Sequence, residues 1–129
     1  MKRLILIAVL VPSLAFAAGS TLSVFNNQTT SRTSAVYDVS GWKTKTLHVY
    51  GKYSSAAFFN LSGAVAVKCG PARTGPFTVN CNQSQLASTP AVSTTTNSVI
   101  SWQDAVQFIQ ITWTRTKRAV NVWLSGNSN

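Results

Sequence analysis

The chain has 129 residues and carries 11 lysines and arginines against 2 acidic residues and one histidine, a formal net charge of +9. This length leaves room for one domain of ordinary size with one core. The scarcity of titratable groups argues against an enzyme or a metalloprotein. The cations are scattered along the sequence, which favours solubility and weak attraction to anionic surfaces over nucleic-acid recognition.

The first 17 residues are typical of a secretory signal peptide. Lys2 and Arg3 precede an apolar run that ends in Ala15-Phe16-Ala17, a small-x-small cleavage pattern. The run is shorter than the roughly 20 residues that span a bilayer. We therefore expect cleavage after Ala17 and a mature domain over residues 18–129, with the formal charge lowered from +9 to +7 by loss of the two leader cations. No later segment reads as a membrane span, so the product is expected to be secreted or periplasmic, on a cell surface or in a virion-like structure.

The first part of the mature chain predicts short strands separated by turns. Residues 22–25 predict an edge strand followed by a polar turn at Asn26-Asn27, and residues 35–39 predict a second strand that ends at the turn Ser40-Gly41. The next strand alternates with period two. Its core face is expected to hold Leu47, Val49, Gly51 and Tyr53, and its outer face His48, Tyr50 and Lys52.

A further strand over residues 63–69 ends at the first of two cysteines. Cys69 and Cys81 flank a segment with two Gly-Pro pairs, which allow the chain to double back so that residues 77–80 pair with this strand. An even cysteine count in an exported chain indicates a disulfide. A loop of this size suggests about 3 kcal/mol of stabilisation. A metal site is the alternative, disfavoured because His48 is the single histidine.

Residues 83–97 are rich in Ser, Thr and Pro and predict a long surface connection, or a mobile loop that binds something. A strand over residues 98–102 and a turn at Gln103-Asp104 follow. Residues 106–124 then give the strongest signal in the chain, two alternating strands joined by a basic turn at 115–118, and predict a β-hairpin.

The alternation in this predicted hairpin separates core from surface. The core face is expected to hold Ile109, Ile111 and Trp113 in the first strand, and Val120, Val122 and Leu124 in the second. Asn121 and Trp123 are expected to face outward. An apolar face of this kind needs a second sheet to cover it. The sequence therefore predicts an all-β fold, a β-sandwich or jelly roll of about eight short antiparallel strands.

Three stretches resemble small β-sandwich proteins of bacteriophage virions and tail-associated gene clusters. They are DVSGWKTKTLHVYGK, SGAVAVKCGPARTGPF and DAVQFIQITWTRTKRAVNVWLSG, with a Gly-x-Val-x-Val pattern and a late strand-turn-strand ending in Val-x-Val-x-Leu. The resemblance covers most of residues 34–126 and implies a structural or surface-attachment role in an assembly. The expected leader and disulfide favour an exported relative or a cell-surface assembly protein.

Catalysis has little support in the residues. The only carboxylates are Asp38 and Asp104, each with a plain place at a strand end or turn, and His48 is not accompanied by a G-x-S-x-G nucleophile motif. The Gly-rich phosphate-binding motifs are also absent from the sequence. We therefore expect no enzyme, catalytic residue, metal or cofactor.

The most favoured hypothesis is an exported structural protein that self-associates or attaches to a surface or virion-like structure. A carbohydrate-binding module with exposed aromatic residues is the alternative, and weak nucleic-acid binding comes third. The residues expected to form a ligand or partner face are Trp42, His48, Tyr50, Lys52, Asn121 and Trp123.

Overall fold

The computed structural model describes residues 20–52, 58–81, 92–103 and 105–128, which form ten β-strands. Among these residues there is no helix long and apolar enough to cross a membrane. The expected signal peptide, residues 1–17, lies outside the described residues.

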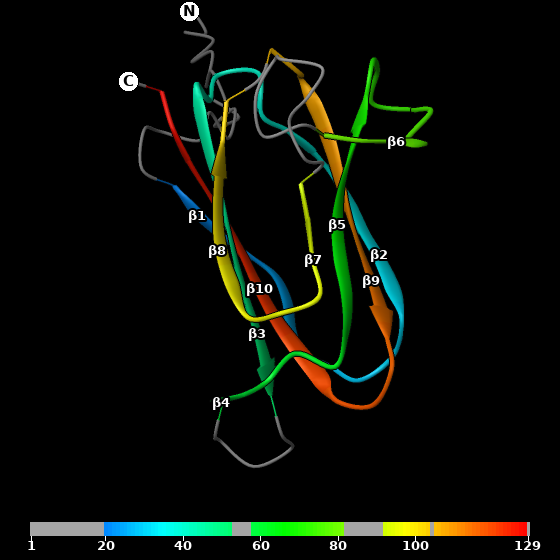
Figure 1. Ribbon diagram of the computed structural model, residues 1–129. Coiled ribbons are helices and arrows are strands. Elements are labelled where there is room, and N and C mark those ends of the chain that lie inside the picture. The colour runs from blue at the N-terminus through cyan, green and yellow to red at the C-terminus, as the bar shows by residue number, and fades with distance from the viewer. Residues whose placement is uncertain (1–19, 53–57, 82–91, 104, 129) are drawn as a thin grey trace, which may run out of the picture.

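The strands form two facing antiparallel sheets (Figure 1). Sheet A has the order β1 (Thr21–Gln28), β10 (Ala119–Asn127) and β3 (Thr44–Lys52), with β8 (Ser98–Trp102) and β4 (Phe58–Phe59) both pairing with the far edge of β3. Sheet B has the order β2 (Arg32–Asp38), β9 (Phe108–Arg115) and β5 (Gly63–Gly70), with β6 (Val79–Asn80) and β7 (Ser93–Thr94) on the far edge of β5.

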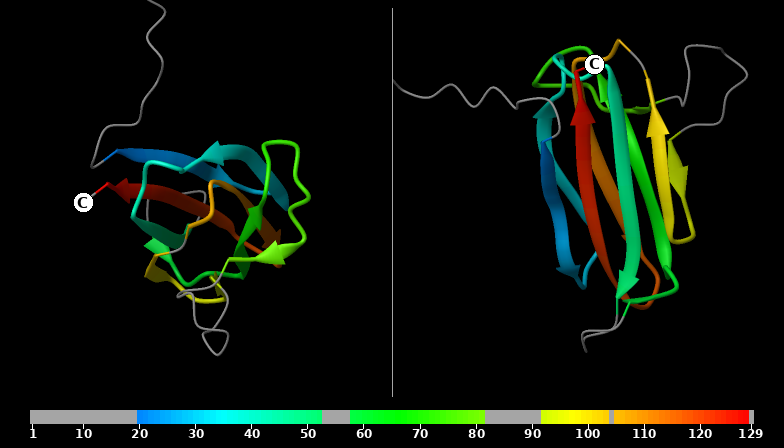
Figure 2. Two further views of the ribbon diagram at one scale, coloured as in Figure 1. Left: turned by 90° about the horizontal axis from the view of Figure 1, so that it is seen from above. Right: turned by 90° about the vertical axis from the view of Figure 1, so that its left-hand side faces the viewer.

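This order is that of a jelly roll. The chain crosses repeatedly from one sheet to the other. Sheet A, in the order β1, β10, β3 and β8, faces sheet B, in the order β2, β9, β5 and then β6 and β7, and β4 is a short addition to sheet A. Figure 2 shows the two layers from above and the face of sheet A from the side. The predicted all-β sandwich is confirmed, and the described residues hold ten strands because β4, β6 and β7, of two residues each, supplement the longer strands.

The core fills the space between the sheets because almost every long strand turns one apolar face inward. In β3 buried and half-buried residues alternate without exception, and in β9 the alternation holds from Phe108 to Trp113. The predicted core face of β9, Ile109, Ile111 and Trp113, is confirmed, since none of the three is more than 1% exposed. The same holds for the inward residues of β10, namely Val120, Val122 and Leu124, which are fully buried.

The predicted hairpin of residues 106–124 is wrong, although both of its strands exist. β9 pairs with β2 and β5 in sheet B, whereas β10 pairs with β1 and β3 in sheet A. The connection over residues 116–118 is therefore an arch that carries the chain from one sheet to the other. In this arrangement the apolar faces of β9 and β10 pack against each other across the core. A hairpin would have placed both strands in one sheet, and another sheet would have had to bury their apolar face.

Two further expectations are corrected near the edges of the sheets. β1 is an edge strand as expected, but it does not turn at Asn26-Asn27; it continues to Gln28 through two irregularities in register, with Asn27 at a φ of 50°. The expected surface connection of residues 83–97 contains β7, which pairs with β5, and Val92, which is fully buried. Residues 82–91 lie outside the described part of the chain.

The two cysteines form the expected disulfide, with 5.1 Å between their Cα atoms. The bridge joins β5 to the residue that follows β6. Cys81 also ties the backbone on both sides, because its N–H donates to the Val67 carbonyl at 2.8 Å and its carbonyl accepts from Val92 N–H at 2.6 Å. The free edge of β5 is thereby covered by a covalently anchored segment.

Replacing Ile111 by Ala should lower the free energy of unfolding by roughly 2 to 5 kcal/mol, because the change leaves a cavity between the sheets. The measurement is a denaturant titration. Thr114→Ala, at an exposed position of the same strand, serves as control and should change stability by less than about 0.5 kcal/mol. Equal losses in the two variants would contradict the assignment of the inner face.

Replacing both Cys69 and Cys81 by Ser should lower stability by about 2 to 4 kcal/mol, since the unfolded chain gains the freedom that the bridge denies it. Thiol titration of the unreduced wild type by mass spectrometry should find no free cysteine and no linked dimer. Two alkylated cysteines, or a disulfide-linked dimer, would contradict the intramolecular bridge.

Candidate binding face

The outer face of sheet A carries the largest group of partly exposed aromatic side chains placed by the strand register. Ser23 of β1 pairs with Trp123 of β10, which pairs with His48 of β3, which pairs with Val99 of β8. Because directly opposed residues point to the same side of a sheet, this row runs across four strands. The four strands lie side by side in the right-hand view of Figure 2.

Tyr50 adds a second aromatic ring beside this row. It is two residues after His48 and therefore on the same face, and its ring meets that of Trp123 edge to face, with 6.0 Å between centroids and 63° between planes. This geometry is a favoured aromatic arrangement. We name Trp123, Tyr50, His48 and Val99 the aromatic strip.

Polar groups border the aromatic strip. Ser125 Oγ lies 3.5 Å from His48 Nε2, and the hydroxyls of Thr46 and Ser101 are 2.9 Å apart on the neighbouring row. Lys52, half-buried, lies at the end of β3 on the same face. The arrangement offers apolar contact together with hydroxyl and imidazole groups, which suits recognition of another surface or of a sugar.

Four of the six residues expected on a partner face lie there: His48, Tyr50, Lys52 and Trp123. Trp42 does not, since only 4% of it is exposed and it belongs to the core. Its ring packs over Gly126, where a Cβ atom would overlap the ring. The expectation that Trp42 is exposed is therefore wrong, because a glycine on β10 leaves room for the indole to fold inward.

Asn121 is also buried, with 3% of it exposed, although its place in the alternation is on the outer side. Its Oδ1 accepts a hydrogen bond of 2.6 Å from the backbone N–H of Asn27. That N–H belongs to the irregular part of β1, where the ladder is interrupted. The role of Asn121 is thus to satisfy a backbone donor at the edge of sheet A.

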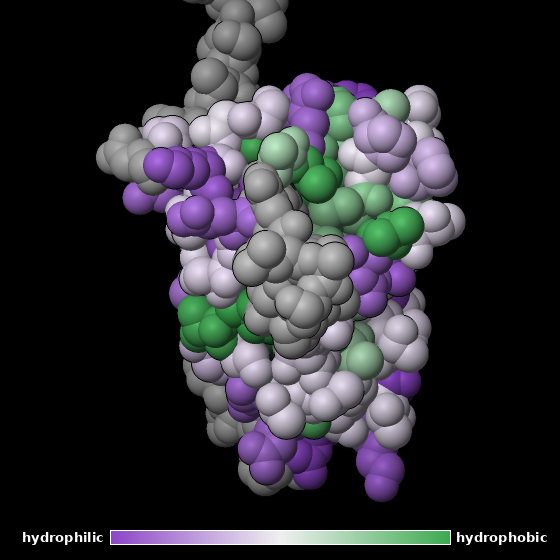
Figure 3. Space-filling view, turned by 45° about the horizontal axis from the view of Figure 1, so that its top comes forward, coloured by the Kyte–Doolittle hydropathy of each residue, from purple (hydrophilic) through white to green (hydrophobic). Residues whose placement is uncertain are grey.

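Sequence reasoning missed Val99, which is 56% exposed and joins the strip. The alternation of this strand predicts its exposure. Ile100 and Trp102 form the apolar face and are buried, so Val99 points to the opposite, outer side. In the view of Figure 3 the apolar residues appear as separate patches between polar ones. Val99 is one of two large apolar residues that are mostly exposed in the described part of the chain, the other being Val79 of β6 in sheet B.

The outer face of sheet B is different in character. Its corresponding row is Thr33, Thr112, Ala66 and Ser93, read across β2, β9, β5 and β7. These side chains are small, and the face is hollowed next to Lys68 by a groove of about 610 Å³. The two outer faces therefore offer unlike surfaces, one aromatic and one lined by hydroxyls.

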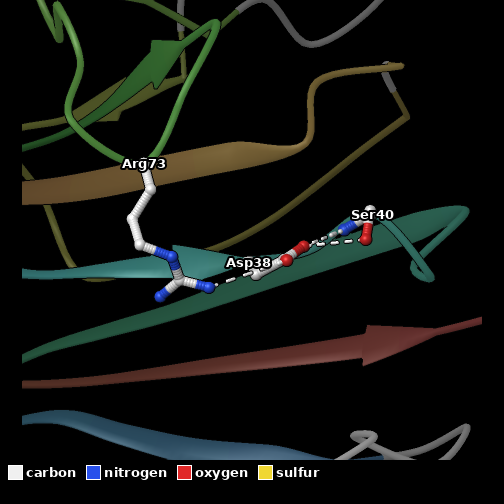
Figure 4. A network of polar contacts seen from close by, with 3 residues as sticks. All are labelled: Asp38, Ser40 and Arg73. Atoms are coloured by element: carbon white, nitrogen blue, oxygen red, sulfur yellow. Dashed lines mark hydrogen bonds and ion pairs between the residues drawn. The ribbon is translucent and has the colours of Figure 1, made fainter.

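The one described carboxylate, that of Asp38, ends β2 in sheet B and contacts Ser40 and Arg73 (Figure 4). Its Oδ1 accepts hydrogen bonds from the Ser40 hydroxyl at 2.7 Å and from Ser40 N–H at 3.1 Å, and Arg73 lies 3.9 Å from its Oδ2. The Arg73 guanidinium also lies 5.7 Å above the centre of the Phe108 ring. Hydrogen bonding from Ser40, aided by Arg73, lowers the pKa of Asp38 below its ordinary value.

These contacts explain Asp38 as a turn residue that holds the loop after β5 against the end of β2 and the start of β9. The His48 ring lies 3.5 Å from Ser125 Oγ on the outer face of sheet A, whereas Asp38 ends β2 in sheet B. The described residues therefore do not join Asp38 to His48, and within them no group of three or more His, Cys, Asp or Glu is placed to hold a metal ion. Asp104 lies outside the described residues.

Fold and surface together define a disulfide-stapled jelly-roll β-sandwich with one aromatic outer face. No protein-family model matches the sequence, and no curated protein matches it. Among solved structures the fold is similar to that of the SPBc2 prophage-derived protein YomS, with a TM-score of 0.64 and 13% sequence identity over 84% of this chain and 91% of that chain. The likeness is one of fold, and it is to a protein of prophage origin.

The carboxyl of Asp38 should titrate below its ordinary value of 3.8. A carboxyl whose pKa is lower in the folded than in the unfolded chain stabilises the fold when it is ionised. The stabilisation by Asp38 is therefore present near neutral pH and is lost as the pH falls through the pKa that Asp38 has in the folded protein. NMR titration of the Asp38 carboxyl should show Ser40→Ala raising its pKa more than Arg73→Gln does. The reverse order would mean that charge attraction, not hydrogen bonding, sets the pKa.

Proposed function

We propose that this protein is an exported structural module that assembles, with copies of itself or with a larger surface or virion-like structure, through the aromatic strip on sheet A. The observation that carries the proposal is the edge-to-face pair of Trp123 and Tyr50 beside the exposed Val99. Aromatic residues near the centre of a surface patch are typical anchors of protein interfaces.

The size of the face supports this use. The four strands lie about 4.8 Å apart and rise about 3.3 Å per residue, and the longest of them, β3 and β10, have nine residues, so the face measures at most roughly 19 by 30 Å. Its projected area is on the order of 600 Å², near the roughly 800 Å² that one partner buries in a standard interface. One outer face of the sandwich is therefore enough to hold a specific contact.

The fold similarity and the disulfide support the proposal of an exported, virion-like assembly protein. The fold resembles that of a prophage-derived protein, which agrees with the resemblance of the sequence to phage-associated β-sandwich proteins. Disulfides persist in oxidising compartments, and the bridge of Cys69 and Cys81 together with the expected leader favours a protein that works outside the cytoplasm.

Carbohydrate binding is the second candidate, and the same face gives the observation for it. Trp123 and Tyr50 offer ring faces for a sugar, and His48, Ser125 and Thr46 offer hydrogen-bonding groups beside them. A glycan array on the mature protein separates the two functions. Binding of a glycan by a monomer would favour this candidate over assembly.

Replacing Trp123 by Ala should weaken self-association or partner binding by at least about tenfold, because the change removes the largest side chain of the strip. The thermal midpoint should fall far less than for a core truncation such as Ile111→Ala. Size-exclusion chromatography with light scattering and a melting curve measure the two effects.

Thr112→Ala on the outer face of sheet B is the matched control and should leave association unchanged. Trp123→Phe should retain most of the association, because it keeps an aromatic ring in the same place. If Trp123→Ala associates like the wild type, or if Thr112→Ala weakens association equally, the aromatic strip is not the assembly surface.

A further inference from the structure

One end of the sandwich gathers cations that lie far apart in the sequence. It is the end at which β9 passes into β10 and β3 stops, at the bottom of Figure 1. We name it the basic end, and its members are Arg32, Lys52, Arg115, Lys117 and Arg118. The cations are scattered along the sequence, but the fold brings these five to one end.

The strand register brings them together from both sheets. Lys52 pairs with Ala119, the neighbour of Arg118, in sheet A. In sheet B, Arg115 pairs with Gly63, and Arg32 pairs with Trp113 two residues before Arg115. Because the two sheets lie about 10 Å apart, the positive charges spread over both layers of a blunt end and do not follow one line.

Hydrogen bonds hold the connections at this end in a fixed relation. Ser31, in the connection between β1 and β2, accepts from Arg115 N–H at 2.8 Å through its hydroxyl oxygen. Thr116 N–H and Lys117 N–H both donate to the carbonyl of Ser62, which precedes β5, at 2.9 and 3.3 Å. The cations therefore project from a rigid platform of three connections.

The Arg115 side chain contributes to this platform. Its Nε donates to the Arg118 carbonyl at 3.3 Å, and its terminal nitrogen donates to the Lys117 carbonyl. Arg115 thus closes the arch while keeping its charge at the surface. The exposed side chains of Lys117 and Arg32 remain directed to the exterior of the same end.

Nothing acidic within the described residues offsets this charge at the basic end. The described carboxylate, Asp38, ends β2 at the opposite end of the sandwich and pairs with Arg73 there. Like charges held together in this way repel one another, and an anionic partner removes that cost. The arrangement is therefore complementary to a surface that presents many negative charges.

We propose that the basic end docks the sandwich end-on onto the phosphate headgroups of an anionic phospholipid bilayer. A two-dimensional spread of cations on a blunt end fits a planar array of headgroups, whereas nucleic acid is tracked by cations along a groove or stripe. The docked orientation leaves the aromatic strip, which runs across the side of the sandwich, open to lateral partners. The basic end shares only Lys52 with the candidate binding face, and the inference does not rest on the proposed function.

The test is co-sedimentation of the mature protein with vesicles of phosphatidylglycerol and phosphatidylcholine in equal parts, and with vesicles of phosphatidylcholine alone. The protein should bind the anionic vesicles only, and more weakly as salt is raised. Each cation removed from the surface should weaken partitioning by about fivefold. The double variant Arg32→Gln, Lys117→Gln should therefore bind about 25-fold more weakly.

The matched control is the double variant Lys43→Gln, Arg73→Gln, which removes the same charge from exposed positions at the opposite end of the sandwich. It should bind within about twofold of the wild type, because charges beyond roughly 10 Å are screened. Circular dichroism and melting curves confirm that both variants fold. Trp123→Ala should bind vesicles like the wild type, so that failure of this proposal and failure of the assembly proposal remain distinguishable.

Three results would overturn the proposal. The first is no binding to anionic vesicles at low salt. The second is equal weakening in the two double variants, which would mean that net charge alone acts. The third is tighter binding of a labelled random-sequence DNA duplex than of vesicles, with the same dependence on Arg32 and Lys117, which would assign the basic end to nucleic acid.

Discussion

The burial of one face of almost every long strand between two sheets is the constraint on which the rest of this structure depends. Ile109, Ile111 and Trp113 on one wall meet Val120, Val122 and Leu124 on the other, and none is more than 1% exposed. Because the inner face of each strand is fixed in this way, the side chains on its outer face are fixed too. The aromatic strip and the hydroxyl-lined face are consequences of the same alternation.

The alternation made the strands and the inner faces predictable from sequence, but not the pairing of the strands. A run of β9, a short polar connection and β10 has the same pattern whether it forms a hairpin or an arch between sheets. Only the partners available in the whole chain decide: β10 has ladders with β1 and β3 on its two sides, and β9 has ladders with β2 and β5. The pairing is therefore a property of the whole chain.

Residues that depart from the alternation were also beyond local prediction. Lys45 lies on the inner side of β3 and is fully buried, and Trp42 turns inward over a glycine of β10. Asn121 is covered because an irregular edge strand needs its side-chain oxygen. By contrast His48, Tyr50 and Trp123 were placed on one face correctly, since their positions follow from period two. The basic end could not be predicted without the topology, because its five cations come from three strands and one connection, in both sheets.

We propose two roles for the surfaces of this sandwich, a lateral contact on sheet A and membrane docking at the basic end. The most direct measurement of the central claim is photo-crosslinking of the assembled protein. A benzoylphenylalanine residue is placed either at position 99, in the aromatic strip, or at position 112, on the outer face of sheet B. Assembly through sheet A predicts intermolecular adducts from position 99 and none from position 112. Adducts from position 112 alone would contradict the account.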